Sequence, residues 1–134
     1  MRLDLSSLQK ALPSLQKAAD RSQKAPSDEE LRDAVIQRFE YSYELCWKMI
    51  KRALEQEAAS PAEVDQLSYQ DLFRTAAEKG IISKVEPWFE YRQQRNITSH
   101  TYDAKKAKKV YDSALKFLKD ATALLQTLEK RNAG

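Results

Sequence analysis

Apolar residues recur at three- and four-residue steps along most of the chain, the spacing of helices that bury one face. The first apolar stripe spans roughly residues 3–23 and consists of Leu5, Leu8, Leu12, Leu15 and Ala19. Pro13 lies inside this stripe, and proline removes a hydrogen-bond donor and clashes with the preceding turn. We therefore expect a helix that is kinked here or split into two shorter pieces.

The broadest apolar face predicts a central helix that ends near Glu57. It follows a break at residues 25–28, where Ser27 or Asp28 can cap its first turn. The face carries Leu31, Val35, Phe39, Cys46, Met49, Ile50, Ala53 and Leu54. Because this face is wide, we expect the helix to lie at the centre of the core.

Three further helices complete the predicted fold. One covers roughly residues 68–79 and stops at Gly80, a residue suited to ending a helix. Another starts near Lys84, and the last begins near Asp103, which can act as its N-cap. Since the connections are short, we predict an all-α fold, an antiparallel up-down bundle of four to five helices.

Composition narrows the class of protein. The length of 134 residues favours one domain over residues 1–134. The 2 glycines are too few for a glycine-rich phosphate loop or a sheet of tight hairpins, and 1 cysteine and 1 histidine argue against disulfide scaffolds and zinc sites. We expect no metal and no cofactor. No apolar run approaches the roughly 20 residues of a membrane span, so we expect a soluble cytoplasmic protein without membrane contact.

Positive charge gathers at the C-terminal end, although the net charge is only +3. Residues 101–134 carry 8 Lys/Arg against 4 Asp/Glu, whereas residues 1–100 carry 15 against 16. The excess centres on Lys105, Lys106, Lys108 and Lys109. Such a stretch attracts polyanions, although the charge pattern alone favours a solvated helix face.

The junction before the last helix is the most polar connection in the chain. Its chemistry-bearing residues are Arg95, Asn96, His100 and Tyr102. An unbroken helix would put Arg95 and His100 roughly 140° apart, so a shared site requires the helix to end near Thr98-Ser99. The arginine can then clamp a phosphate, the histidine can move protons, and the N-terminus of the next helix favours an anion. The residues alone leave open that both side chains only cap helix ends.

This junction resembles the signature of a known family. Arg95-x4-His100-x-Tyr102 is similar to the R-x4-H-x-Y motif of HEPN-domain proteins. Residues 37–48, QRFEYSYELCWK, resemble the second helix of their nucleotidyltransferase-substrate-binding branch, and the likeness extends from LDLSSLQKAL to the last helix. The resemblance implies a HEPN-type bundle that forms a homodimer with the R-x4-H segments facing each other.

The resemblance also implies a function. Many HEPN domains are metal-independent ribonucleases, and this branch is typically encoded beside a minimal nucleotidyltransferase. The pair often acts as a toxin and antitoxin, in which the transferase adds AMP to the tyrosine of the motif. Carried onto this chain, Arg95 and His100 are catalytic, Tyr102 is the modification acceptor and RNA is the substrate. Asn96, Lys105 and Lys106 are then the candidate substrate-binding residues.

The chemistry of RNA cleavage agrees with a shared site. Metal-free cleavage needs a base at the 2′-hydroxyl, an acid at the leaving 5′-oxygen and cations on the phosphorane. One chain supplies one histidine, whereas a two-fold dimer gathers two copies each of His100 and Arg95. AMP on Tyr102 would compete with the RNA phosphate. The alternatives are a non-catalytic subunit that binds a nucleotide or nucleic acid for the transferase, and a purely structural helical partner.

Two features of the central helix have competing interpretations. Glu40 and Glu44, four residues apart, can orient Arg95 or His100, but a solvated flank is the favoured interpretation. Cys46 lies on the apolar face, so we expect it to be inert buried packing.

Three aromatic side chains raise a similar question. They are Trp47, Trp88 and Phe89. Aromatic rings can stack on nucleic-acid bases. Their helical spacing among other apolar residues instead favours the core or a dimer interface.

Overall fold

The computed structural model describes residues 2–134, which form helices and their connections without any strand. The elements are α1 (Ser6–Lys24), α2 (Glu29–Glu57), α3 (Pro61–Asp65), α4 (Tyr69–Glu78), α5 (Glu86–Ile97), the 3-10 turn η1 (Thr98–His100) and α6 (Ala104–Ala133). The predicted all-α bundle is confirmed, with five main helices and the short α3. Within residues 2–134 no helix is both long enough and apolar enough to span a membrane.

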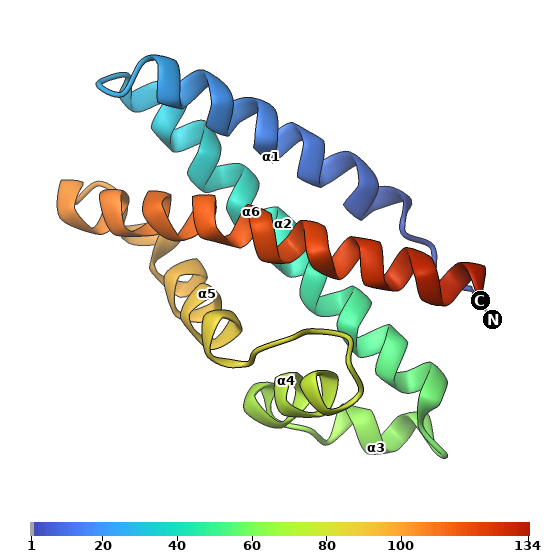
Figure 1. The fold of residues 1–134 in the computed structure, drawn as a ribbon. Helices are drawn as coiled ribbons and strands as arrows, with labels where there is room; N and C mark the ends of the chain where they lie inside the picture. Colours follow the sequence, from blue (N-terminus) through green and yellow to red (C-terminus); the bar gives the residue numbers. More distant parts are fainter. Residues whose placement is uncertain (1) are drawn as a thin grey trace.

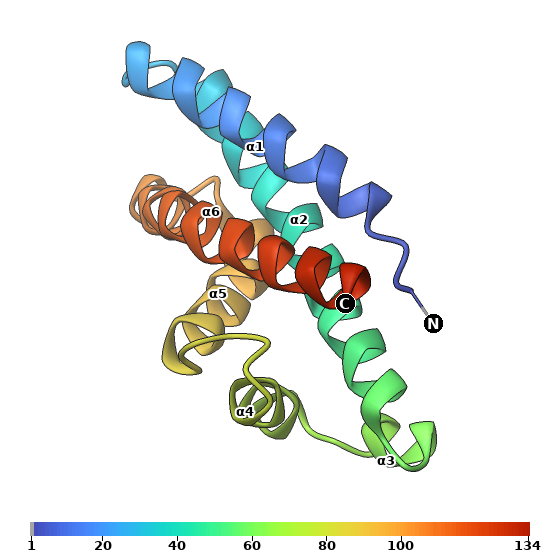
Figure 2. The same ribbon diagram turned by 45° about the vertical axis from the view of Figure 1, so that its right-hand side comes forward.

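The long helices α1, α2 and α6 form the body of the molecule (Figure 1). α1 and α2 lie side by side as a helical hairpin, and α6 crosses α2 while it also contacts α1 (Figures 1 and 2). α5 packs against α6 and α2. α4 contacts α2 and lies below α5 in the view of Figure 1. The two ends of the chain meet, because Asn132 bonds to both the N–H and the carbonyl of Leu3, at 3.0 and 2.9 Å.

α1 passes through Pro13 as one helix, so the expected split into two pieces is wrong. Pro13 is exposed, and so is Gln9, four residues earlier. The Gln9 carbonyl loses its usual N–H donor, but because Gln9 is exposed, water can replace that donor. The buried stripe on the opposite side, which includes Leu8, Leu12 and Leu15, holds both halves of the helix in place.

Local signals set the helix ends where the sequence places them. Asp28, rather than Ser27, caps α2, because its Oδ1 accepts the N–H groups of Glu30 and Leu31 at 2.9 and 3.2 Å. α4 ends just before Gly80, whose φ of 75° is unfavourable for other residues. These contacts form between near neighbours, which explains why the sequence reveals them.

An aromatic cluster fixes α5 against the rest of the bundle. The Phe117 ring of α6 lies 5.1 Å from Phe39 of α2, and 5.4 and 5.9 Å from Tyr91 and Trp88 of α5, between ring centroids. All four side chains are buried. The Tyr91 hydroxyl also donates to the Asp120 carboxylate on α6. This packing sets the position of the C-terminal end of α5, which carries Arg95.

Candidate functional site

The polar junction is a tight turn between α5 and α6. α5 ends at Ile97 and the 3-10 turn Thr98–His100 follows, as a shared Arg95–His100 site requires. Side chains and backbone of the turn bond to one another: the Thr101 hydroxyl donates to the Thr98 carbonyl at 3.1 Å, and the Asp103 N–H donates to the His100 carbonyl at 3.2 Å. The junction is therefore an ordered turn at which the chain passes from α5 into α6.

Arg95 is held against α2 by a single ion pair. Its Nε donates to Glu44 Oε1 at 2.6 Å, and both side chains are about one third exposed, 34% and 40%. Within residues 2–134 the guanidinium makes no other hydrogen bond, so its two terminal amino groups remain open. A planar guanidinium oriented in this way can bind two oxygens of one phosphate.

Glu40 reaches the same turn, so the solvated-flank interpretation of the two glutamates is wrong. The Thr98 hydroxyl donates to the Glu40 carboxylate and lies 2.8 Å from the Arg95 carbonyl oxygen. The pair lies four residues apart on α2, so both carboxylates face the end of α5. Their spacing is visible in the sequence, but the element they face is set only by the fold. Glu44 orients Arg95, and Glu40 fixes the turn that follows.

His100 and Tyr102 extend from the turn into solvent. His100 is exposed, and 85% of Tyr102 is accessible. Their rings meet edge to face, with centroids 6.2 Å apart. No hydrogen bond or ion pair joins Arg95 to His100 within the described chain. One copy of the junction thus presents an oriented cation at the end of α5, and an exposed imidazole and an exposed phenol in the residues that follow.

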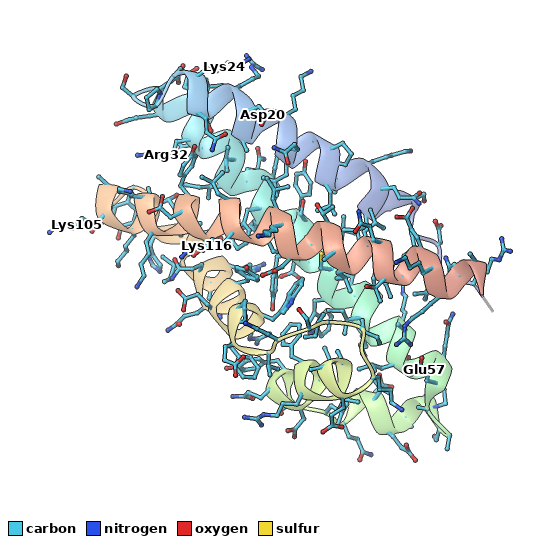
Figure 3. All side chains as sticks on the ribbon, in the orientation of Figure 1. Asp20, Lys24, Arg32, Glu57, Lys105 and Lys116 are labelled. Carbon is cyan, nitrogen blue, oxygen red and sulfur yellow. The ribbon has the colours of Figure 1, made fainter. Side chains whose placement is uncertain are left out.

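The lysine-rich start of α6 is exposed, but its backbone is already capped. Asp103 Oδ1 accepts the N–H groups of Lys105 and Lys106 at 2.9 and 3.1 Å. The expected phosphate site on these N–H groups is therefore occupied by a carboxylate of the chain itself. The side chains of Lys105 and Lys106 remain exposed, and Lys105 projects from the tip of the helix (Figure 3).

The weaker candidates fall mostly into the core. Cys46 is completely buried, which raises the pKa of its thiol and confirms it as packing. Trp88 is buried, and Trp47 is half-buried against the core. Phe89 packs edge to face on Tyr69, with ring centroids 6.0 Å apart, and is also half-buried. Among residues 2–134, no group of three or more His, Cys, Asp or Glu side chains is placed to hold a metal ion.

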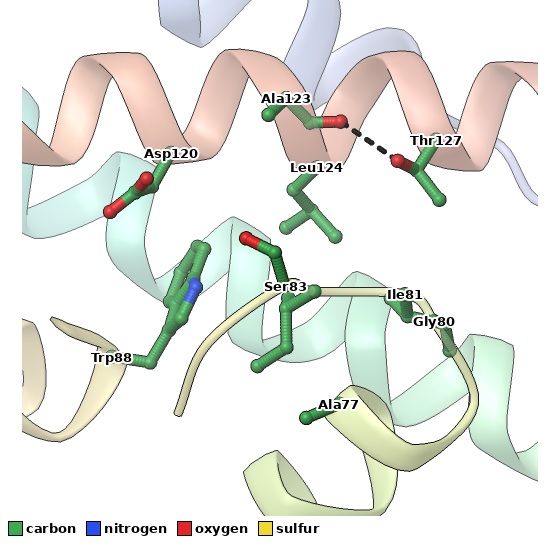
Figure 4. A pocket seen from close by; sticks show the side chains of 10 residues that line it. Ala77, Gly80, Ile81, Ser83, Trp88, Asp120, Ala123, Leu124 and Thr127 are labelled. Atoms are coloured by element: carbon green, nitrogen blue, oxygen red, sulfur yellow. Dashed lines mark hydrogen bonds between the residues drawn. The ribbon is translucent and has the colours of Figure 1, made fainter. Parts of the chain in front are cut away.

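A cavity of about 380 Å³ lies between the α4–α5 connection and α6 (Figure 4). Asp120 is the one charged residue among those that line it, and Trp88 forms part of its wall. Neither Arg95 nor His100 lines it. Because its charge is negative, it does not suit a phosphate, and the junction remains the candidate site.

Comparison with known proteins places this fold and junction in one family. The family described as "Nucleotidyltransferase substrate binding protein like" matches residues 3–130. A protein from Haemophilus influenzae named "Probable ribonuclease HepT" is 43% identical over 97 residues. That alignment covers 72% of this chain and 66% of the relative, just under two thirds of its length.

A solved structure has the same architecture. HI0074 from Haemophilus influenzae, described as the fold of a substrate-binding domain of a nucleotidyltransferase, superposes with a TM-score of 0.89 at 34% identity. The superposition covers 94% of this chain and 99% of that one. The family match spans nearly all described helices, including the junction with Arg95, His100 and Tyr102. The chain therefore belongs to the nucleotidyltransferase substrate-binding family, the HEPN branch that its sequence resembles.

Proposed function

We propose that this chain is a metal-independent ribonuclease, paired with a minimal nucleotidyltransferase, whose site is completed by a second copy of the chain. The observation that carries the proposal is the α5–α6 junction, where Glu44 orients Arg95 and leaves its terminal amino groups open, and where His100 is exposed five residues later. The name of the Haemophilus relative, "Probable ribonuclease HepT", supports the same activity.

Each group in the turn has a role in this reaction. Arg95 holds the scissile phosphate and offsets the charge that develops on the phosphorane. One copy of His100 takes the proton of the 2′-hydroxyl as it attacks phosphorus. The second copy donates a proton to the 5′-oxygen as the P–O bond breaks. Asn96, Lys105 and Lys106 are exposed around the turn and bind the flanking RNA.

Cleavage of RNA in EDTA tests this activity. The unmodified protein should cut total RNA, and His100→Ala should lose the cutting while circular dichroism and sedimentation stay those of the parent. Equal cutting by the parent and the variant would falsify the assignment of His100.

Tyr102 is the proposed point of control. Its phenol is 85% exposed and its ring lies 6.2 Å from that of His100. Attack of the phenol oxygen on the α-phosphorus of ATP would form a Tyr–AMP bond and release pyrophosphate. The added anion next to His100 would compete with the RNA phosphate. The transferase would then act as the antitoxin of a toxin–antitoxin pair.

Mass spectrometry after incubation with the transferase and ATP tests this control. The chain should gain mass in units of AMP, and Tyr102→Phe should gain none. Tyr41→Phe, which changes the other exposed tyrosine, is the matched control and should gain mass as the parent does. A full gain in Tyr102→Phe would place the modification elsewhere.

A non-catalytic role is the second candidate, because HI0074 is described as a substrate-binding domain of a nucleotidyltransferase. In that case the same turn, with Arg95 and His100, holds a nucleotide or nucleic acid for the transferase. Arginine, histidine and lysine serve binding as well as catalysis. Long incubation of the unmodified chain with bound RNA in EDTA distinguishes cleavage from binding alone. RNA that is bound but stays intact would favour the non-catalytic role.

A further inference from the structure

A second polar pocket lies between α4 and α5, close to the C-terminal end of α5 that carries Arg95. Its volume is about 420 Å³. We call it the α4–α5 pocket, and its lining includes Tyr69, Arg74, Phe89, Arg92, Gln93 and Asn96. The lining contains two guanidinium groups, two aromatic rings and amide side chains, and none of its described residues is a carboxylate. Such a set of groups is suited to an aromatic ligand with negative charge.

Each of the two arginines of this pocket lies over one of its two rings. The guanidinium carbon of Arg92 lies 4.0 Å from the centroid of Tyr69, and that of Arg74 lies 5.7 Å from the centroid of Phe89. The two rings pack edge to face, 6.0 Å apart. Tyr69 thus supports the Arg92 guanidinium, and both side chains line the pocket. Nucleic-acid bases stack on supported guanidinium planes of this kind.

Charge and hydrogen bonding fit a nucleotide as well. Arg74 is paired with Asp71 at 3.3 Å, whereas Arg92 forms no ion pair within the described residues. Arg92 therefore brings an uncompensated positive charge into the pocket. The amides of Gln93 and Asn96 are exposed at its edge and can donate to and accept from the edge of a base.

The pocket adjoins the proposed cleavage site along α5. Arg92, Arg95 and Asn96 lie within about 100° of one another around α5. Asn96 lines the pocket and directly follows Arg95 in the chain. A strand whose phosphate is bound by Arg95 would therefore bring a neighbouring nucleotide to the rim of the pocket.

We propose that the α4–α5 pocket binds the base of a nucleotide adjacent to the phosphate held by Arg95, with single-stranded RNA as the ligand. This inference rests on the proposed function. Arg92 supplies the stacking surface and the charge, and Asn96 bonds to the base edge. The pocket then selects unpaired RNA, because a base inside a duplex cannot leave its stack to enter it without loss of pairing.

Binding of a fluorescent 2′-O-methyl pentaribonucleotide tests the pocket, because this probe cannot be cleaved through its 2′-oxygen. We expect Arg92→Lys to weaken binding about tenfold, since lysine keeps the charge but loses the stacking plane. Arg21→Lys makes the same change at an exposed position of α1 and should bind as the parent does. If the parent binds the probe and Arg92→Lys binds it with the same affinity, the base-binding role of the α4–α5 pocket is wrong, while the proposed ribonuclease function is unaffected. No binding by the parent would contradict both.

Two further binding measurements, with AMP and with the nucleotidyltransferase, test whether single-stranded RNA is the ligand of the pocket. If AMP alone binds the parent as tightly as the oligonucleotide and loses affinity in Arg92→Lys, the pocket holds free mononucleotides and the RNA assignment is wrong. If Arg92→Lys weakens binding of the nucleotidyltransferase instead, the pocket is a protein contact.

Photo-crosslinking of a 4-thiouridine pentaribonucleotide to the parent gives an independent measurement. Crosslinked peptides should contain Tyr69 or Phe89, and crosslinks confined to other helices would contradict the proposal.

Discussion

At the scale of single residues, the site depends on how one carboxylate holds one arginine. Glu44 binds only the Nε of Arg95, at 2.6 Å, so the guanidinium is oriented while its outer edge stays open. A half-exposed ion pair of this kind contributes little to folding. Its main effect is therefore on the position of Arg95, the proposed phosphate-binding group, for which an error of about an ångström is costly in rate.

Glu44→Gln should accordingly reduce activity much more than stability. We expect the cleavage rate to fall about tenfold or more, while the free energy of unfolding changes by less than about 1 kcal/mol. Glu55→Gln is the matched control on α2, because Glu55 makes no ion pair within residues 2–134. Rates and urea unfolding are measured on the same preparations. A Glu44→Gln variant that cleaves at the rate of the parent would show that this ion pair does not position Arg95 for the reaction.

At the scale of elements, the turn is built by two helix ends that meet. Thr98 ties the end of α5 to Glu40 of α2, and Asp103 caps the start of α6. His100 and Tyr102 lie between these two anchors. The position of both side chains therefore depends on α6 starting at Ala104.

Removal of the cap should loosen the start of α6. We expect Asp103→Ala to lower the free energy of unfolding by about 1 kcal/mol, whereas Asp103→Asn, also a good N-cap, should retain most of it. Denaturant unfolding of both variants measures the difference. Equal losses in the two variants would mean that the charge of Asp103, rather than its hydrogen bonds, stabilises the helix.

Elements defined by local contacts were predictable from the sequence, and contacts between distant elements were not. The apolar faces of α2 and α6 and the caps Asp28 and Asp103 follow from neighbouring residues. The predicted split of α1 at Pro13 was wrong because the proline and Gln9 lie on the solvent-facing side of the helix. The contacts of Glu40 and Glu44 required the placement of α5. The α4–α5 pocket could not be predicted, because Tyr69 and Arg92 are separated by a connection whose path the sequence does not specify.

At the scale of the whole molecule, positive charge collects at the end of the bundle that carries the turn. Lys105 and Lys106 are exposed there, directly after the capped turn. A flexible polyanion is attracted to such an end over several ångströms, and the attraction weakens with added salt.

The salt dependence of RNA binding should report these lysines. For the double variant Lys105→Ala and Lys106→Ala, we expect the slope of log affinity against log salt to become shallower by about 1.4, because each phosphate contact on a single strand contributes about 0.7. The matched control changes Lys10 and Lys17, both exposed on α1, to alanine. An unchanged slope in the first variant would show that these lysines do not contact the RNA backbone.

The central claim is that two chains share one cleavage site, each supplying its single histidine. Parent and His100→Ala chains are mixed in different ratios, unfolded together, refolded at constant total concentration and assayed for RNA cleavage in EDTA. If each site needs both copies of His100, activity follows the square of the parent fraction, so that half parent chains give about one quarter of the activity. Activity proportional to the parent fraction itself would contradict the shared site.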